Sequence, residues 1–327
     1  MKNRNLLKEL TIIIPTHERP IALNRHLNYL KEHYNNLNIF ILDSSNKVNK
    51  DLKEFKNYFH IRGKNANTKI SKILNKIKTK YVVTIGDDDF FIFEGLNNCL
   101  KFLNNNHKYD GVHGKYVVHS KIVNHSLFNF YKFIEINYPY NFKLKIKNNF
   151  INACNYISGK LPPLNYSVFK SEIFKKVWKI STNTKRESQI FLELIPNLLF
   201  YLYANIKCID TYYISRQSSP RKKIQTQFET KNFKLLINFI DQNLYKKKII
   251  SYEKYLKIIK ILKIRKINED LRIKNKRLSI KQLKIYKMLK LIYLLIFKKI
   301  KFEKRIIKQF ILKYHGVIQE IEKTVSR

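Results

Sequence analysis

The stretch YVVTIGDDDFF, residues 81–91, carries the signals that decide the fold. Its first half is a short run of β-branched and other apolar residues, which predicts a buried strand over residues 81–85. Its second half places Asp87, Asp88 and Asp89 directly after that strand. Ligands of open α/β sheets bind outside the carboxyl ends of the strands, so this position favours a binding site.

Two further strands are predicted upstream of this stretch. Residues 10–15 and 37–43 are apolar runs of strand length. Residues 23–34 and 66–77, which follow these runs, repeat apolar side chains with helical spacing, and Pro20 suits the first turn of the earlier helix. Strands that alternate with helices favour parallel pairing through crossovers, so we expect an α/β sheet flanked by helices.

Polar residues follow all three predicted strands. They occupy residues 16–19, 43–45 and 87–89. The carboxyl ends of parallel strands meet at one edge of a sheet, so we expect these residues to form one site. No Gly-rich phosphate loop follows any of the strands, which argues against a Rossmann dehydrogenase and a P-loop enzyme.

The three consecutive aspartates have two interpretations. Side chains alternate along an extended chain, so Asp87 and Asp89 are expected on one side and Asp88 on the other. Two carboxylates on one side, with water or phosphate oxygens completing the shell, suit Mg²⁺ or Mn²⁺. The alternative is a solvated acidic turn. Neighbouring carboxylates repel by about 1 kcal/mol in water and about 4 kcal/mol near a protein surface, which favours a counter-cation here.

The chain has 327 residues and is strongly basic, with 65 Lys+Arg against 24 Asp+Glu and a formal net charge of +41. This charge favours anionic partners such as nucleic acid, acidic lipid headgroups or phosphorylated substrates. A general bias of composition toward Lys, Asn, Ile and Tyr is the alternative source of the charge. With 44% hydrophobic and 13% aromatic residues the chain can bury a core, which excludes wholesale disorder.

The cysteines and the apolar runs indicate a compartment. Cys99, Cys154 and Cys208 are far apart and form no CxxC spacing, so neither a disulfide nor a zinc site is expected. Residues 10–14 are too short an apolar run for a signal peptide, and residues 288–297 amount to about half of a membrane span. We expect a cytoplasmic protein, either soluble or held peripherally on the inner face of the cell membrane.

The character of the chain changes after Pro220. Residues 221–327 hold 31 Lys+Arg and 8 Asp+Glu, a net charge of +23, with helical spacing of apolar residues. We therefore expect a domain over residues 1–220 and a basic α-helical extension over residues 221–327. The extension either packs on the domain, lies on an anionic bilayer, or binds nucleic acid through its Lys and Tyr residues. A nucleic-acid-binding protein is the alternative function, but it leaves the aspartates unexplained.

The strand-end motifs together resemble the family 2 glycosyltransferases of GT-A fold. The resemblance rests on LTIIIPT at residues 10–16, ILDSS at residues 41–45, and YVV at residues 81–83 leading into the aspartates. It covers residues 1–120 well and extends weakly to about residue 220. It implies a GT-A-like nucleotide-binding mixed sheet. It also implies transfer of a sugar from a nucleoside diphosphate sugar, with a UDP-sugar favoured, to a glycan or lipid-linked acceptor of the cell envelope.

The resemblance also implies roles for individual residues. Thr16 and Asp43 match the residues that contact the nucleotide base, and Arg19 matches the arginine of the first loop. The family usually has Asp-Asp-Gly-Ser after the second strand, whereas this chain has Asp-Ser-Ser at residues 43–45.

The acidic motif is implied to hold a metal ion. Its last residue, Asp89, matches the residue that ligates the metal, and Asp87 or Asp88 is then expected near the ribose and the diphosphate. Asp87 is the second expected metal ligand, because the alternation of side chains places it on the same side as Asp89. The ion is expected to be Mn²⁺ or Mg²⁺.

Inverting members of the family use a carboxylate at a helix start to deprotonate the acceptor. Glu187, in KRES at residues 185–188, precedes an apolar helical pattern and is the first candidate. A glutamate there also suits the helix macrodipole without any catalytic role. Asp110, beside Gly111 at a strand start, is the second candidate, and an ordinary turn residue is its alternative reading.

Overall fold

The computed structural model describes most of the chain up to residue 278. The described parts are residues 4–33, 37–52, 55–61, 66–120, 134–135, 148–182, 189–218 and 230–278. The chain divides into two compact units, Met1–Ile259 and Lys260–Arg327. Pro220, where we predict a domain boundary, lies outside the described residues, so that boundary stays a prediction.

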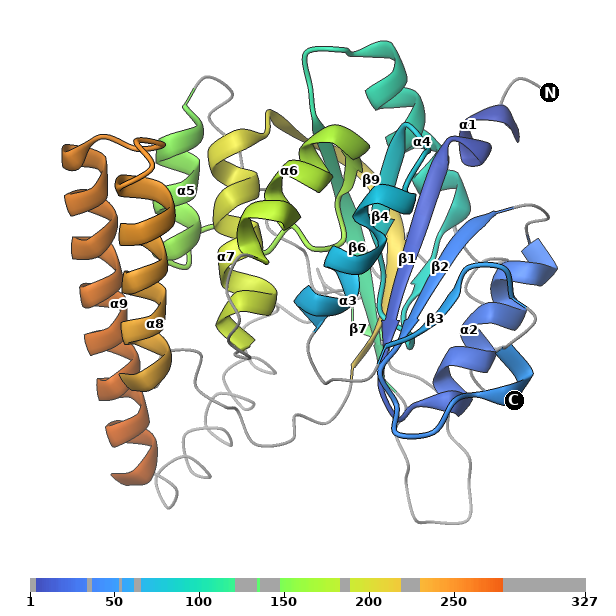
Figure 1. The fold of residues 1–327 in the computed structure, drawn as a ribbon, viewed down its shortest axis with the longest axis horizontal. Helices are drawn as coiled ribbons and strands as arrows, with labels where there is room; N and C mark the ends of the chain where they lie inside the picture. Colours follow the sequence, from blue (N-terminus) through green and yellow to red (C-terminus); the bar gives the residue numbers. More distant parts are fainter. Residues whose placement is uncertain are drawn as a thin grey trace, which may run out of the picture. The chain divides into compact units, whose positions relative to one another are not determined.

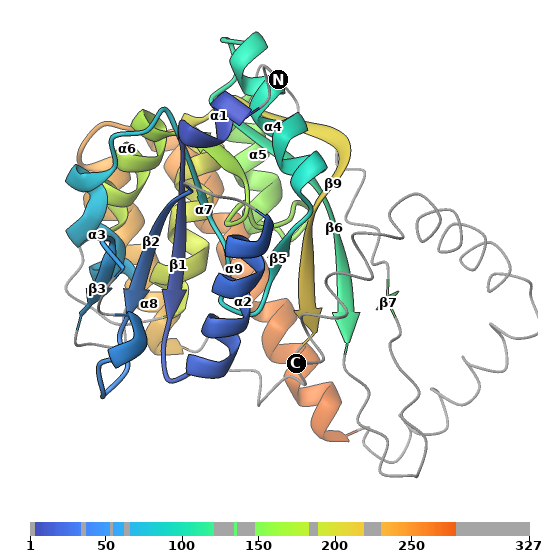
Figure 2. The ribbon, with the colours of Figure 1, turned by 90° about the vertical axis from the view of Figure 1, so that its right-hand side faces the viewer.

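A mixed sheet forms the centre of the first unit (Figures 1 and 2). Over the described residues its strand order is β3-β2-β1-β4-β8-β6-β9-β5, and β7 pairs with β6 off this path. The strands are β1 (Leu10–Thr16), β2 (Asn38–Asp43), β3 (Tyr58–His60), β4 (Tyr81–Thr84), β5 (Phe90–Phe91), β6 (Gly111–Ser120), β7 (Ile134–Glu135), β8 (Val168–Lys170) and β9 (Ile206–Ser218).

The sheet contains both parallel and antiparallel strand pairs. Strands β3, β2, β1 and β4 run parallel to one another, as the alternation of strands and helices predicts. Strand β8 runs antiparallel to both β4 and β6, while β6 and β9 are parallel. The expected α/β mixed sheet flanked by helices is therefore confirmed.

Helices cover both faces of the sheet. The helices of the described residues are α1 (Arg4–Lys8), α2 (Pro20–His33), α3 (Ala66–Ile73), α4 (Phe93–Asn105), α5 (Asn149–Ile157), α6 (Ser171–Ser181), α7 (Gln189–Tyr203), α8 (Thr230–Ile240) and α9 (Tyr252–Leu278). Helices α3, α6 and α7 contact one another on one face, and α2 and α4 lie on the other (Figure 2). Tyr29 of α2 stacks on Phe93 of α4, with ring centroids 5.7 Å apart.

The double cover explains the sequence of the first strand. Leu10, Ile12, Ile13 and Ile14 of β1 are completely buried, because layers of helices lie against both faces of the sheet. A strand buried on both faces needs a continuous apolar run, not an alternating pattern. The ring of Phe169 in β8 stacks on the ring of Phe200 in α7, with the two centroids 4.0 Å apart.

The strand register fixes the two edges of the sheet. Thr16 pairs with Asp43, and β4 runs beside β1, so the residues after all three strands meet at one edge. Strand β6 begins at the opposite edge, because Gly111 pairs with Phe169 and Phe169 pairs with Val82 near the start of β4.

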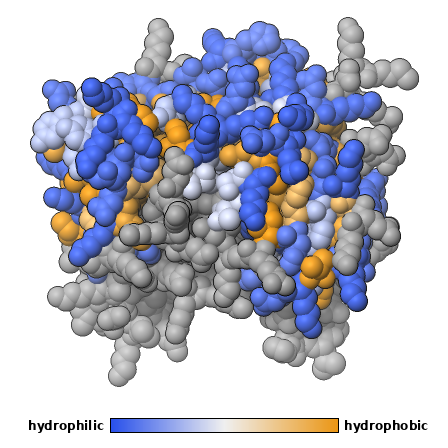
Figure 3. All heavy atoms as spheres, in the orientation of Figure 1, coloured by the Kyte–Doolittle hydropathy of each residue, from blue (hydrophilic) through white to orange (hydrophobic). Residues whose placement is uncertain are grey.

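The surface and the helical tail agree with the basic composition. Figure 3 shows mainly hydrophilic residues among those coloured on this face, with apolar side chains between them.

The predicted helical character after residue 220 is confirmed over α8 and α9, and residues 279–327 lie outside the described part. Among the described helices, none combines the length and the apolar character that crossing a bilayer requires.

Candidate active site

Thr16, Arg19 and the aspartates after β4 form one hydrogen-bonded cluster. The hydroxyl of Thr16 donates to Asp87 Oδ2 at 2.7 Å. The guanidinium of Arg19 bridges two carboxylates: Nη1 donates to Asp87 Oδ1 at 2.7 Å and Nη2 donates to Asp88 Oδ2 at 2.5 Å. Four of the residues predicted for the nucleotide-sugar site therefore lie together at the predicted edge.

A tight turn, not an extended chain, presents these carboxylates. The N–H of Asp89 donates back to the carbonyl of Gly86 at 3.4 Å. The expected alternation is therefore wrong: Asp87 and Asp88 share Arg19, while Asp89 turns toward β9. A Cβ at Gly86 would lie 2.9 Å from Asp89 Oδ2 and 3.1 Å from Asp88 Oδ1, so any other residue there would displace these carboxylates.

Asp89 is held by residues that lie far away in the sequence. Its Oδ2 accepts a hydrogen bond of 2.7 Å from the hydroxyl of Tyr166, and its Oδ1 accepts one of 2.9 Å from the N–H of Gln217. The guanidinium Nε of Arg216 lies 3.8 Å from Oδ2. Burial raises the pKa of Asp89 to about 6, and the charge of Asp88 adds to this, against the opposing effect of Arg216.

Asp43 ends β2 beside the cluster and is 2% exposed. Its Oδ1 accepts from the N–H and the hydroxyl of Ser45 at 2.8 and 2.6 Å, and its Oδ2 accepts from the hydroxyl of Tyr58 at 2.7 Å. Burial raises the pKa of Asp43, but these hydrogen bonds outweigh burial, and the net pKa is lowered. Asp43 is therefore a rigid, ionised carboxylate at the edge of the sheet.

Lys69 of α3 joins the ends of β1 and β2. Its Nζ donates to the carbonyl of Thr16 at 2.8 Å and to the hydroxyl of Ser44 at 3.0 Å. Only 3% of Lys69 is exposed, and burial lowers its pKa to about 8, although Asp43 and Asp87 act in the opposite direction. Sequence reasoning missed this residue, although its position four residues before the buried Ile73 places a lysine on an apolar helix face.

The donor chemistry of Asp87 and Asp89 fits a divalent cation. Both carboxylates offer only oxygen, the ligand type that Mg²⁺ and Mn²⁺ prefer. Burial raises the pKa of both carboxyl groups, against the opposing effects of Arg19 and Arg216, and a bound cation would favour their ionised forms. Within the described residues no three His, Cys, Asp or Glu side chains converge as a complete site, so the substrate would have to supply the remaining ligands.

The structure does not bring Asp110 to the cluster. It precedes β6 at the opposite edge of the sheet, where it forms a reciprocal pair with Asn205. The N–H of Asn205 donates to Asp110 Oδ2 at 2.8 Å, and the N–H of Asp110 donates to the carbonyl of Asn205 at 2.8 Å. These contacts are those of a turn aspartate, so the geometry gives no support to Asp110 as the base.

Glu187 lies outside the described residues, but the helix that follows it is described. Helix α7 begins at Gln189 and ends at Tyr203, close to Asn205 at the far edge. Near the middle of α7, Asn197 donates to Asn165 Oδ1 at 2.7 Å, and Thr84 at the end of β4 donates to the carbonyl of Asn165. The first turn of α7 therefore lies on the side of the sheet at which β4 ends. The role of Glu187 as the base stays a prediction.

A comparison with known families decides the identity of this region. The model described as Glycosyl transferase family 2 matches residues 11–169. This segment, just under half of the chain, is therefore similar to the family 2 glycosyltransferases. The protein is accordingly a glycosyltransferase that uses a nucleotide-sugar donor. The resemblance inferred from the strand-end motifs is confirmed.

Solved structures to which the chain is similar include three of S. aureus TarS. The 1–349 fragment in complex with UDP-GlcNAc has 12% identity and a TM-score of 0.48, covering 77% of this chain and 70% of that one. A second TarS structure has 13% identity and a TM-score of 0.46, covering 78% and 43% of the two chains. The 1–349 fragment with UDP has 12% identity and a TM-score of 0.44, covering 77% and 69%. No curated protein matches the chain.

The segment that matches the glycosyltransferase family includes the three aspartates but not all of the residues that contact Asp89. Tyr166 lies just inside the matched segment, whereas Arg216 and Gln217 lie beyond it. Arg216 and Gln217 lie beside Asp89 because β5 pairs with β9, with Phe90 opposite Ser215. No local sequence pattern marks these contacts, which is why the sequence did not predict them.

Proposed function

We propose that this glycosyltransferase moves a sugar from a UDP-sugar to a glycan or lipid-linked acceptor of the cell envelope, with inversion at the anomeric carbon. A divalent ion, Mn²⁺ or Mg²⁺, is proposed to take part. The observation that carries the proposal is the convergence of three strand ends on one buried carboxylate cluster. That cluster combines hard oxygen ligands with cations that attract a diphosphate.

Different residues around the cluster are proposed to bind the base and the phosphates of the donor. Asp43 and Thr16 are proposed to recognise the base, and Lys69 fixes both strand ends by binding the carbonyl of Thr16 and the hydroxyl of Ser44. The side chain of Arg19 is 45% exposed although it bonds two aspartates, so its guanidinium is positioned to meet an incoming phosphate.

The chemical step is assigned to carboxylates. Asp89 and Asp87 would hold the divalent ion, which when bound supplies a Lewis acid that neutralises the leaving diphosphate. Glu187 is proposed to take the proton from the acceptor hydroxyl as its oxygen attacks the anomeric carbon. The buried, hydrogen-bonded setting of Asp89 keeps this side of the site preorganised.

The proposed location follows from charge and from the acceptor. A cytoplasmic enzyme that is held peripherally on the inner face of the membrane would meet lipid-linked acceptors there. The basic helices after residue 220 would supply the attraction to anionic headgroups.

A panel of nucleotide sugars tests the donor. The full chain is incubated with UDP-, GDP- and dTDP-sugars in the presence of Mn²⁺, and release of the nucleoside diphosphate is measured. We expect a UDP-sugar to bind and to be hydrolysed slowly without an acceptor. Binding and hydrolysis restricted to another nucleotide would overturn the choice of UDP, and no binding to any of them would overturn the proposal.

A further inference from the structure

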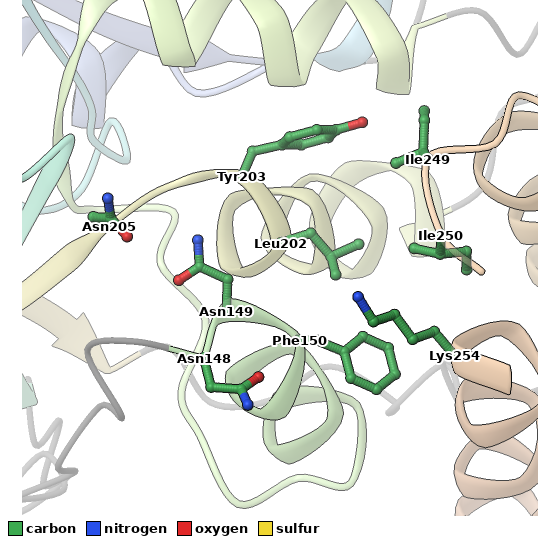
Figure 4. Close-up of a pocket in the computed structure, with 9 residues that line it drawn as sticks. All are labelled: Asn148, Asn149, Phe150, Leu202, Tyr203, Asn205, Ile249, Ile250 and Lys254. Carbon is green, nitrogen blue, oxygen red and sulfur yellow. The ribbon is translucent and has the colours of Figure 1, made fainter.

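A second concave site lies in the first unit, away from the aspartate cluster. It is a pocket of about 430 Å³ formed by the start of α5, the end of α7, the segment before α9 and the first turn of α9 (Figure 4). Asn205, one of its lining residues, pairs with Asp110 at the edge where β6 begins. The pocket therefore belongs to the edge of the sheet opposite to the donor site.

The lining of this pocket is rich in amide groups. Asn148, Asn149 and Asn205 contribute amides, Tyr203 contributes a phenol, and Lys254 contributes an ammonium group. None of the described residues that line the pocket carries a carboxylate. The side chain of Asn148 is oriented because its Oδ1 accepts from the N–H of Ile151 at 3.0 Å. More than half of the lining residues are therefore polar, whereas pockets for drug-like ligands are mostly apolar.

Positive charge and aromatic faces accompany these amides. The ammonium of Lys254 points into the pocket above Phe150, with Nζ 5.5 Å from the ring centroid (Figure 4). Lys257 lies 6.0 Å from the same centroid, and Lys176 lies 4.3 Å from the ring centroid of Tyr203. The electrostatic environment of the pocket thus favours an anion, and its two rings provide apolar faces.

We propose that this pocket binds a glycan segment that carries an anionic group. Amide side chains both donate and accept hydrogen bonds, which matches a ligand covered with hydroxyl groups. Lys254 would pair with the anionic group, and the ring of Phe150 would contact the apolar face of a sugar. The role as a second contact for the acceptor rests on the proposed function, whereas the binding itself does not.

Calorimetric titration of the full chain with α-D-glucose 1-phosphate tests the binding. UDP and Mn²⁺ are present throughout, so that the donor site is occupied. We expect saturable binding, with the Kd raised about fivefold or more by Lys254→Gln and by Asn149→Ala. The matched control is Lys247→Gln, which removes the same charge from an exposed lysine that bonds Asn243 and does not line the pocket. It should leave the Kd unchanged.

Four results would overturn the proposal. The first two are no binding of glucose 1-phosphate by the wild-type chain and an unchanged Kd in Lys254→Gln and Asn149→Ala. The third is equal affinity for inorganic phosphate, which would show that the sugar contributes nothing. The fourth is equal affinity for methyl α-D-glucoside, which should bind more weakly because it lacks the anionic group. Because binding is measured without turnover, failure of the proposed sugar transfer would leave these results unaffected.

Discussion

At the scale of single residues, Asp43 offers a clean test of base recognition. Its carboxylate is buried, ionised and held by Ser45 and Tyr58, so replacing it removes a fixed acceptor at the edge of the sheet. We expect Asp43→Ala to raise the KM for the donor or to relax the choice of nucleotide, because a hydrogen bond to the base mainly supplies binding.

The measurement for Asp43 is steady-state kinetics with a UDP-sugar and with the same sugar on another nucleotide. The control is Asp51→Ala, which removes a carboxylate from an exposed position in the segment after β2. An unchanged KM together with an unchanged nucleotide preference would refute the role of Asp43.

Lys69 predicts a pH dependence of stability. Its folded-state pKa of about 8 lies below its ordinary value of 10.5, so the unfolded chain binds more protons between these pH values. Burial of the charged ammonium group lowers the free energy of unfolding by its full amount below pH 8, and this loss disappears as the pH rises toward 10.5. The Lys69→Met variant does not have this dependence. The free energy of unfolding of the wild type should therefore gain on the order of 2 kcal/mol relative to the variant across this window.

Denaturant unfolding at several pH values between 7 and 10.5 measures the effect. The control is Lys72→Met, which removes an exposed lysine from the same helix. Parallel stability curves for wild type and Lys69→Met would show that the charge of Lys69 is not buried as described.

At the scale of elements, the segment before α7 contains Glu187, the proposed general base. Glu187→Gln keeps the shape of the side chain but cannot take a proton. If Glu187 is the base, kcat should fall by roughly 10²–10⁴-fold with little change in donor binding. Single-turnover kinetics and donor titration measure the two quantities.

The control for Glu187 is Glu172→Gln, an exposed glutamate in the first turn of α6. Activity of Glu187→Gln within a factor of a few of the wild type would exclude Glu187 as the base. Asp110 would not replace it readily, because its carboxylate binds the backbone of Asn205 at the opposite edge.

Elements also show how far the sequence could predict this structure. Strands β1, β2 and β4 were predictable because burial on both faces requires apolar runs, and their ends identified Thr16, Arg19 and the aspartates. Strands β3, β5 and β8 span two or three residues each, too few for a periodic pattern.

The remaining parts of the site depend on contacts that are distant in sequence. Arg216 and Gln217 lie beside Asp89 because β5 pairs with β9, and Tyr166 reaches Asp89 from the segment before β8. No local sequence pattern predicts either contact. The alternation predicted for the aspartates failed because a turn closes at Asp89, and Gly86 was its only sequence signal.

At the scale of the whole molecule, the net charge of +41 predicts attraction to anionic surfaces. Each basic side chain near an anionic bilayer contributes about 1 kcal/mol, and salt screens the interaction. We expect the full chain to co-sediment with acidic liposomes at low salt and to be released at high salt. Equal binding to neutral vesicles would contradict this, and tighter salt-sensitive binding to RNA or DNA would favour the nucleic-acid alternative.

The central claim is that the buried carboxylates after β4 hold the metal on which sugar transfer depends. Asp89 is the residue to change, because it is 3% exposed and its partners come from two other parts of the chain. The matched control is again Asp51→Ala, and thermal unfolding confirms that each variant is folded.

The most direct measurement is release of UDP from a UDP-sugar donor by the wild type and by Asp89→Ala, each with Mn²⁺ and with EDTA. We predict that the wild type turns over only with Mn²⁺, that Asp89→Ala does not turn over in either condition and binds the donor more weakly, and that Asp51→Ala behaves as the wild type. Full activity of the wild type in EDTA, or of Asp89→Ala with Mn²⁺, would contradict the claim.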